Sequence, residues 1–164
     1  MPAEPPVESP ASLDEALALL SSDNSWRPIA GGTDLMVQIT GELGPPPERV
    51  LDIWRLDELR GIFQDDGALE FGALVTYSDI RRSADCQRLL PALVQCAATI
   101  GAAQIQNRGT IGGNVVNASP AGDTLPILLA TDAELVLASA AGRRRVGAKD
   151  FWTGYRETAR RPDE

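Results

Sequence analysis

Two adjacent glycine pairs, Gly31-Gly32 and Gly112-Gly113, set the strongest limits on how this chain can fold. Each pair follows a predicted structural element and precedes small polar residues. Glycine tolerates positive φ angles and lets backbone N–H groups approach a ligand closely, so such turns can form concave nests that hold phosphate oxygens. The alternative is that both pairs are tight structural turns, since glycine pairs are common in turns. In either case we expect the chain to turn at both places.

The residues around the first pair predict alternating helices and strands. Residues 12–15 have the sequence of a capping box, and the apolar residues after them repeat at the spacing of one helix face as far as residue 22. Short apolar runs predict buried strands at 26–30 and 50–53, with a helix at 35–39 between them. The first third of the chain therefore has a βα-type order.

The chain after residue 59 changes to a shorter period. Alternating apolar residues on both sides of Asp65-Asp66-Gly67 predict a hairpin, and residues 133–146 predict a second hairpin that turns at Gly142. Between the hairpins we expect helices that start near Thr76 and that run over 91–100 and 124–131. This antiparallel remainder, after the βα-type first third, predicts the α+β fold class.

The length suits one soluble globular domain, or two lobes that share a core. The chain has 164 residues, of which 43% are hydrophobic and 23% charged, which is enough to bury a real core. The proline-rich residues 1–10 predict an extended N-terminal segment, and residues 41–47 predict a loop. No apolar run approaches the roughly 20 residues needed to span a bilayer.

Composition excludes several kinds of chemistry. The chain has no histidine, which excludes a Ser-His-Asp triad, and its two cysteines, Cys86 and Cys96, are too few for an iron–sulfur cluster. We interpret both cysteines as packing residues and expect no protein-bound metal. The net charge of −8 has the wrong sign for nucleic-acid binding, and Arg143-Arg144-Arg145 is interpreted as a solvated strand. Two free cysteines without a visible export signal favour the cytoplasm.

The residues alone leave the role of Asp123 open, and they exclude one known motif for the first glycine pair. Asp123 precedes a predicted helix, so it can cap that helix or accept hydrogen bonds from the hydroxyl groups of a ligand. Because Gly31 and Gly32 are adjacent and no third glycine follows at the required spacing, the segment does not fit the G-x-G-x-x-G dinucleotide motif.

Three segments taken together carry a resemblance to a known family. Residues 30–35 read AGGTDL, residues 104–114 read QIQNRGTIGGN, and residues 118–123 read ASPAGD. At this joint spacing the chain resembles the FAD-binding subunit of molybdenum hydroxylases, the family of xanthine dehydrogenase and aerobic carbon monoxide dehydrogenase. The resemblance covers the chain from about Val7.

The resemblance implies an α+β FAD-binding domain of the p-cresol methylhydroxylase/vanillyl-alcohol oxidase type. Such a domain would have a small three-stranded N-terminal lobe, here residues 11–60, after the extended segment 1–10. A larger lobe built on an antiparallel sheet would follow, here residues 61–164. Relatives continue into a C-terminal domain that is absent here, so we expect a truncated or a naturally short form.

The resemblance also implies a set of cofactor contacts. The backbone of the first glycine block would hold the FAD pyrophosphate, and the second block would line the other side of the diphosphate and the ribityl chain. Asp123 would hydrogen-bond the cofactor, and Ala102 would lie against it. Gln106 is left out because the family often has arginine there. The predicted FAD-binding residues are Ala30, Gly31, Gly32, Thr33, Asp34, Leu35, Ala102, Thr110, Ile111, Gly112, Gly113, Asn114 and Asp123.

The function implied by the resemblance is electron transfer within an oxidoreductase complex. Electrons would leave a molybdopterin-binding large subunit, pass through the [2Fe–2S] clusters of a small partner subunit to FAD on this chain, and reach NAD, oxygen or another acceptor. No catalytic side chain or metal ligand is expected on this chain, because the cofactor carries the chemistry. One alternative is a flavin-free scaffold that docks partner subunits. Another is a self-contained flavin oxidase, against which the short length and the absence of histidine argue.

Overall fold

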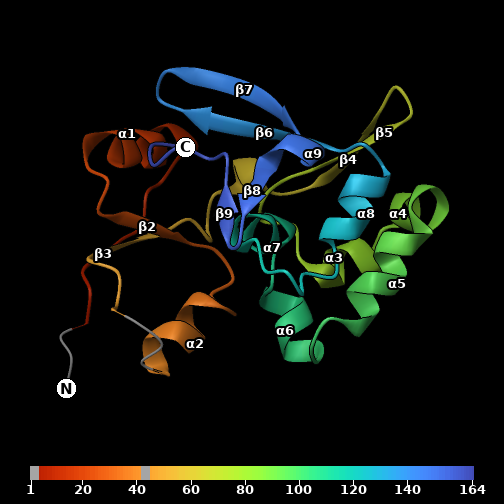
Figure 1. The fold of residues 1–164 in the computed structure, drawn as a ribbon, viewed down its shortest axis with the longest axis horizontal. Coiled ribbons are helices and arrows are strands. Elements are labelled where there is room, and N and C mark those ends of the chain that lie inside the picture. The colour runs from red at the N-terminus through yellow and green to blue at the C-terminus, as the bar shows by residue number, and fades with distance from the viewer. Residues whose placement is uncertain (1–3, 42–44) are drawn as a thin grey trace.

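The first third of the fold is a small parallel sheet flanked by two helices. The computed structural model describes residues 4–41 and 45–164 (Figure 1), so residues 1–3 of the predicted extended segment and residues 42–44 of the predicted loop lie outside the described residues. The strand order is β1-β3-β2 with all neighbours parallel, which confirms the predicted three-stranded arrangement. The strands are β1 (Val7–Glu8), β2 (Trp26–Ile29) and β3 (Arg49–Asp52), and the helices between them are α1 (Leu13–Ser22) and α2 (Leu35–Thr40).

Helix α1 begins at the predicted capping sequence. The Ser12 hydroxyl accepts a hydrogen bond from the Glu15 N–H at 3.2 Å, which satisfies one free donor of the first turn. The Glu15 carboxylate accepts from the N–H of Ala11 at 2.7 Å, one residue before the position that a complete capping box requires. Ala16 and Leu20 are the buried residues of α1, and they pack against Leu51 of β3. The predicted helix is therefore confirmed, with half of the capping box formed.

The prediction of one antiparallel sheet in the larger lobe was wrong. Among the described residues, this region forms three separate two-stranded antiparallel sheets. Alternating polarity indicates which face of a strand is buried, but it does not indicate whether the outer edges of two hairpins pair with each other. The pairs are β4 (Ile62–Asp65) with β5 (Ala68–Phe71), β6 (Glu134–Ser139) with β7 (Gly142–Gly147), and β8 (Trp152–Gly154) with β9 (Glu157–Thr158).

Short helices fill the chain between the first two of these hairpins (Figure 1). The predicted helices near Thr76, at 91–100 and at 124–131 are confirmed as α3, α5 and α8, whereas α4, α6 and α7 were not predicted. None of the helices in the described residues is long and apolar enough to cross a membrane. The bounds are η1 (Asp57–Leu59), α3 (Tyr77–Arg82), α4 (Ala84–Leu89), α5 (Pro91–Thr99), α6 (Ala103–Arg108), α7 (Ile111–Asn117), α8 (Leu125–Ala130) and α9 (Ala148–Phe151).

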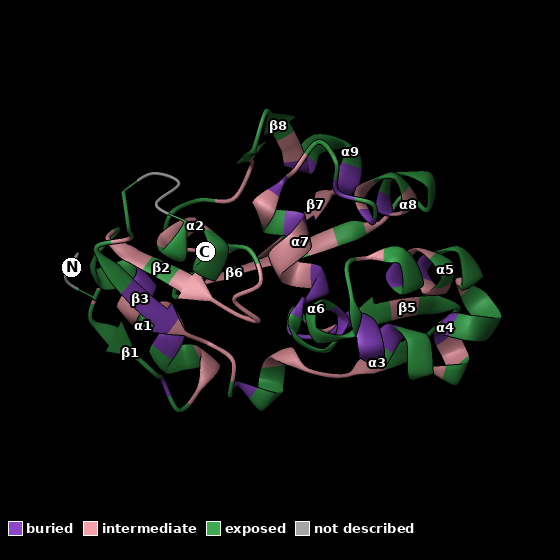
Figure 2. Ribbon diagram, turned by 90° about the horizontal axis from the view of Figure 1, so that it is seen from below, coloured by how far each residue is buried: buried purple, intermediate pink, exposed green. Residues whose placement is uncertain are grey.

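The core consists of three buried clusters, and α7 belongs to two of them. In Figure 2 the buried residues gather along β3 and α3, whereas β1 at the sheet edge is exposed. Ile111 of α7 packs in the α3–α5 cluster, which includes Cys86, and Val115 packs in the cluster of α8 and α9. Helix α7 is thus held from two sides. The clusters are Ala16, Leu20, Leu51, Leu56 and Leu74; Val75, Tyr77, Ile80, Cys86, Leu93, Ala97 and Ile111; and Val115, Leu128, Ala148 and Phe151.

One arginine of the predicted solvated strand is instead half-buried and part of an ion pair. Arg144 of β7 donates from Nε to Glu164 Oε1 at 2.5 Å and from Nη2 to Glu164 Oε2 at 2.7 Å, and the Glu164 side chain is only 3% exposed. The hydrogen bonds from Arg144 hold the pKa of Glu164 below its ordinary value of 4.5. Arg143 and Arg145 are exposed, as predicted.

We expect Glu164→Gln to lower the thermal midpoint at neutral pH by a few degrees, because the glutamine loses the charge that Arg144 pairs with. Since the folded-state pKa of Glu164 lies below its unfolded-state pKa, the ionised carboxylate stabilises the fold above the unfolded value. This contribution disappears as the pH falls through the folded value. Thermal unfolding followed by circular dichroism should therefore give a difference that shrinks below pH 4.5. Glu157→Gln, at an exposed position of β9, is the control, and a difference that does not depend on pH would contradict the prediction.

Candidate functional site

The two predicted glycine blocks lie side by side in the structure. We call residues 30–35 the first glycine segment and residues 110–114 the second glycine segment. Arg108, just before the second segment, donates from Nε to the Gly31 carbonyl oxygen at 3.4 Å, across 77 residues of sequence. Asn117, just after the second segment, donates from Nδ2 to Asp34 Oδ1 at 3.1 Å. The fold therefore brings together the two segments that the sequence singled out.

The first glycine segment joins β2 to α2 and presents unpaired backbone donors. Gly32 has a φ of +75°, in the left-handed region that favours glycine. A Cβ on Gly31 would lie 1.6 Å from the carbonyl oxygen of Arg108, so no side chain fits there. Within the part of the chain that the structure describes, the five N–H groups of residues 31–35 donate to no protein group. Consecutive free N–H groups of this kind suit an anion.

The expected turn at Gly112-Gly113 was wrong, because both glycines lie in the first turn of α7. The Thr110 hydroxyl caps this helix and accepts from the Gly113 N–H at 3.0 Å. The Gly112 N–H donates to the Ala73 carbonyl oxygen at 3.0 Å, and a Cβ on Gly112 would lie 2.6 Å from that same oxygen. Glycine is thus required at residue 112 for close packing against the backbone and not for a turn.

Asn114 at the inner end of the second segment has its amide oxygen engaged. Its Oδ1 accepts a hydrogen bond from the hydroxyl of Thr124, which is fully buried. Among the described residues, nothing accepts from the Asn114 Nδ2 group. Asn114 is half-buried, so this amide group remains available to a ligand.

Asp123 and Ala102, which were also predicted to contact the cofactor, lie outside the two glycine segments. Asp123 is exposed, and α8 is capped at Thr124 without any side-chain hydrogen bond, so the helix-capping role for Asp123 is not supported. Ala102 is exposed at the N-terminal end of α6. Gln106, which the sequence prediction left out, is buried and donates to the Ala98 carbonyl oxygen at 3.2 Å, so it has a structural partner.

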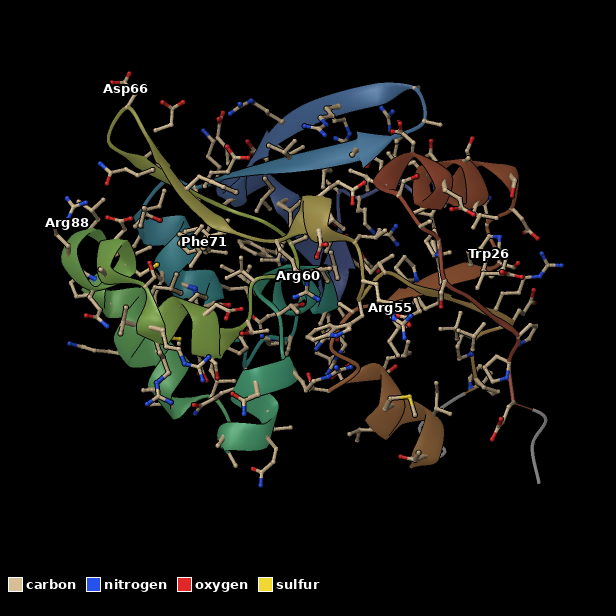
Figure 3. The ribbon with its side chains drawn as sticks, turned by 180° about the vertical axis from the view of Figure 1, so that it is seen from behind. Trp26, Arg55, Arg60, Asp66, Phe71 and Arg88 are labelled. Atoms are coloured by element: carbon tan, nitrogen blue, oxygen red, sulfur yellow. The ribbon has the colours of Figure 1, made fainter. Side chains whose placement is uncertain are left out.

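Sequence reasoning missed a stack of cationic and aromatic side chains at this junction. The Arg108 guanidinium lies 3.8 Å from the centroid of the Trp54 ring, and that of Arg60 lies 4.6 Å from it. Figure 3 shows Arg55 and Arg60 beside the junction between the parallel sheet and the helices. Arg108 belongs to the block that carried the resemblance, but no sequence period connects it to Trp54, whose contact depends on tertiary structure.

Three arginines gather at the junction although the chain is acidic overall. The net charge is −8. Arg156 donates to Asn117 Oδ1 at 2.8 Å, so a third arginine lies just after the second segment. Arg60 has Asp57 at 3.8 Å, but in the described residues neither Arg108 nor Arg156 has a carboxylate within ion-pair distance. A negatively charged ligand beside the first glycine segment would therefore lie near the guanidinium groups of Arg108 and Arg156, neither of which forms an ion pair within the described residues.

A separate hollow of about 380 Å³ is lined by no residue of either glycine segment. Its lining includes Arg60, Val75, Asp79 and Ser83. Because neither glycine segment contributes to this lining, we do not include the hollow in the candidate site.

Comparison with known proteins identifies the class to which this fold and junction belong. Residues 4–164 match the family described as the FAD binding domain in molybdopterin dehydrogenase. The chain belongs to this family, which confirms the resemblance inferred from the sequence. Its mixed α/β fold, with a three-stranded parallel sheet and small antiparallel sheets, is the fold of such a domain.

Individual relatives give the same class. The glyceraldehyde dehydrogenase medium chain of Sulfolobus acidocaldarius is 38% identical over 143 residues, which is 87% of this chain and 50% of that protein. The xanthine dehydrogenase FAD-binding subunit of Escherichia coli O157:H7 is 35% identical over 155 residues, 94% of this chain and 53% of that protein. A chain of the solved carbon monoxide dehydrogenase of Hydrogenophaga pseudoflava aligns with a TM-score of 0.94 at 33% identity, covering 99% of this chain and 57% of that one. The chain spans about half the length of these relatives.

Proposed function

We propose that this chain binds FAD at the junction of its two glycine segments and serves as the electron-transfer component of a molybdopterin-dependent dehydrogenase complex. The observation that carries the proposal is the series of free N–H groups from residue 31 to residue 35, next to the arginines of the junction. Backbone donors and guanidinium groups are the groups that proteins use to hold a diphosphate.

The proposed contacts follow the chemistry of each residue. The first glycine segment holds the pyrophosphate through its backbone, where Gly31 and Gly32 allow close approach. The second segment lines the opposite side, with the Asn114 amide as a donor. Asp123 accepts hydrogen bonds from cofactor hydroxyls, and Ala102 packs against the cofactor. The proposed FAD-binding residues are Ala30, Gly31, Gly32, Thr33, Asp34, Leu35, Ala102, Thr110, Ile111, Gly112, Gly113, Asn114 and Asp123.

The proposed partners are a molybdopterin-binding large subunit and a small [2Fe–2S] subunit. Bound FAD supplies the redox chemistry, accepting electrons from the iron–sulfur clusters and passing them to NAD, oxygen or another acceptor. The residues of this chain bind and orient the cofactor and exclude water from it. The names of the relatives support a multisubunit assembly, since two of those compared are a medium chain and an FAD-binding subunit. We propose that the complex works in the cytoplasm, in keeping with two cysteines that form no disulfide among the described residues.

Titration of the purified chain with FAD tests the proposal. We expect quenching of flavin fluorescence and a visible flavin absorbance that remains with the protein after gel filtration. Riboflavin, which lacks the diphosphate, is the matched control ligand, and we expect it to bind at least about 100-fold more weakly because the free backbone donors meet no phosphate. A chain that takes up no FAD, alone or with its partner subunits, would contradict the proposal and favour the flavin-free scaffold.

A further inference from the structure

A buried phenol lies beneath the second glycine segment. Tyr77, the first residue of α3, is only 2% exposed, and among the described residues its hydroxyl has no hydrogen-bond partner. Its ring lies against the backbone of Gly109, where an added Cβ would be 3.2 Å from Tyr77 Cε2. A buried hydroxyl without a partner destabilises the fold, and phenylalanine would avoid that cost. The hydroxyl therefore calls for an explanation other than packing.

The Thr124 hydroxyl acts on the Tyr77 phenol, although the two do not form a hydrogen bond in the structure. Burial raises the pKa of the Tyr77 phenol well above its usual range, and the Thr124 hydroxyl lowers it, while the charges of Cys96 and Asp123 raise it further. Thr124 is itself fully buried and donates its one proton to Asn114 Oδ1. A threonine hydroxyl has two lone pairs, so the Thr124 oxygen still has room to accept a hydrogen bond from Tyr77.

We propose that Tyr77 is a positioning residue for the cofactor site, through a buried hydrogen-bond chain that runs from Tyr77 to Thr124 to Asn114. In this proposal the Tyr77 hydroxyl donates to the Thr124 oxygen, a bond that is not formed in the structure. The inference rests on the FAD-binding function proposed above. It adds Tyr77, whose hydroxyl contacts neither glycine pair and acts on the site only through Thr124 and Asn114. The three residues come from α3, the start of α8 and α7, so the chain also connects three helices around the site.

The direction of this hydrogen-bond chain determines what Asn114 offers to a ligand. With its oxygen engaged by Thr124, Asn114 keeps only its NH₂ group free, and that group donates two hydrogen bonds. The ligand atom at this position must therefore be an acceptor, such as a flavin carbonyl oxygen, a ribityl oxygen or a phosphate oxygen. If Thr124 accepted from Asn114 instead, the free group would be a carbonyl oxygen and the ligand atom would have to be a donor.

The ligand-free chain provides the first test. Tyr77→Phe removes the hydroxyl and keeps the ring, and Tyr155→Phe, at the chain's other tyrosine, which is 76% exposed, is the matched control. We expect the NMR resonances of the Asn114 side-chain amide to shift in Tyr77→Phe and in Thr124→Val, because linked hydrogen bonds polarise one another. Thr124→Ser, which keeps the hydroxyl, should restore the wild-type position, and Tyr155→Phe should leave it unchanged.

FAD affinity provides the second test. We expect the Kd for FAD to rise about fivefold in Tyr77→Phe and about tenfold in Thr124→Val. Each change removes one hydrogen bond of the chain that orients the Asn114 amide donor. The double variant should bind FAD no more weakly than Thr124→Val alone, since both changes break the same chain. The thermal midpoint of ligand-free Tyr77→Phe should fall by no more than a few degrees, as for the loss of one buried hydrogen bond.

The outcomes separate this inference from the function on which it rests. An unshifted Asn114 amide in Tyr77→Phe, wild-type FAD affinity in that variant, or additive effects in the double variant would overturn the positioning role. If the wild-type chain bound no FAD, the proposed function would fail, and the amide resonances would still decide whether the hydrogen-bond chain exists.

Discussion

Replacing Gly31 with alanine should abolish tight FAD binding and destabilise the fold. The new Cβ would lie 1.6 Å from the carbonyl oxygen of Arg108, which is backbone and has no rotamer to move into. Strain of this kind lies at the upper end of the overpacking range, so we expect the free energy of unfolding to fall by about 3 kcal/mol. If the segments separate to relieve the strain, the same energy corresponds to a loss of about 100-fold or more in FAD affinity. Chemical denaturation and fluorescence titration measure the two effects.

Gly147→Ala is the matched control for this substitution. Gly147 has a φ of −64°, which any residue adopts, and the nearest atom to an added Cβ is 3.8 Å away. We expect wild-type stability and affinity there. A Gly31→Ala chain that keeps wild-type stability and FAD affinity would mean that the two glycine segments are not held in contact as described.

Replacing Gly113 with leucine should remove FAD binding while the fold stays intact. An added Cβ meets only the Thr110 hydroxyl, at 2.9 Å, and no other group within 4 Å. Replacing glycine by leucine within a helix stabilises the fold by about 0.8 kcal/mol. This gain roughly offsets the loss from a weakened Thr110 cap, which contributes about 1 kcal/mol. The leucine side chain would fill the space beside the second glycine segment, and we expect FAD affinity to fall about 100-fold, equivalent to about 2.8 kcal/mol. Thermal unfolding and FAD titration on the same sample measure both.

Gly112→Ala shows why residue 113 is the better site for this test. At residue 112 the added Cβ would lie 2.6 Å from the Ala73 carbonyl oxygen, so we expect the free energy of unfolding to fall by about 2 kcal/mol. A loss of FAD binding in this variant could then result from the lower stability. A Gly113→Leu chain that folds and binds FAD like the wild type would place the cofactor away from the second glycine segment. Binding of partner subunits by this variant would further separate cofactor binding from assembly.

The elements that the sequence predicted well carry their own local signals. Helix α1 begins after Ser12, whose hydroxyl caps it, and α5 begins at Pro91, which has the backbone angle of a first helical turn. Helices α4, α6 and α7 have only six or seven residues each, too few to show a helical period. In α7 the glycine pair adds a further contrary signal, because glycine is a poor helix former. What stabilises that helix is packing by Ile111 and Val115, which depends on tertiary structure.

For the candidate site too, local sequence signals predicted some residues, whereas others depend on tertiary contacts. Both glycine segments could be named from the sequence, since glycine in adjacent pairs is a local signal and the longer blocks resemble one family. The partners that hold the segments together could not be named. Trp54 stacks under Arg108, and Tyr77 lies beneath Gly109, through contacts between residues far apart in the chain. Only the fold determines that these side chains meet.

The closest approach between Gly31 and Arg108 is between main-chain atoms on both sides, and this affects how freely the sequence can change. A surface built from carbonyl oxygens and N–H groups keeps its shape when the outward side chains are exchanged, provided that the positions in closest contact lack a Cβ. Residues 31 and 112 must therefore remain glycine, whereas the residues around them can be substituted more freely. Chains that diverge to about one identical residue in three, as the compared relatives have, can then keep the same junction.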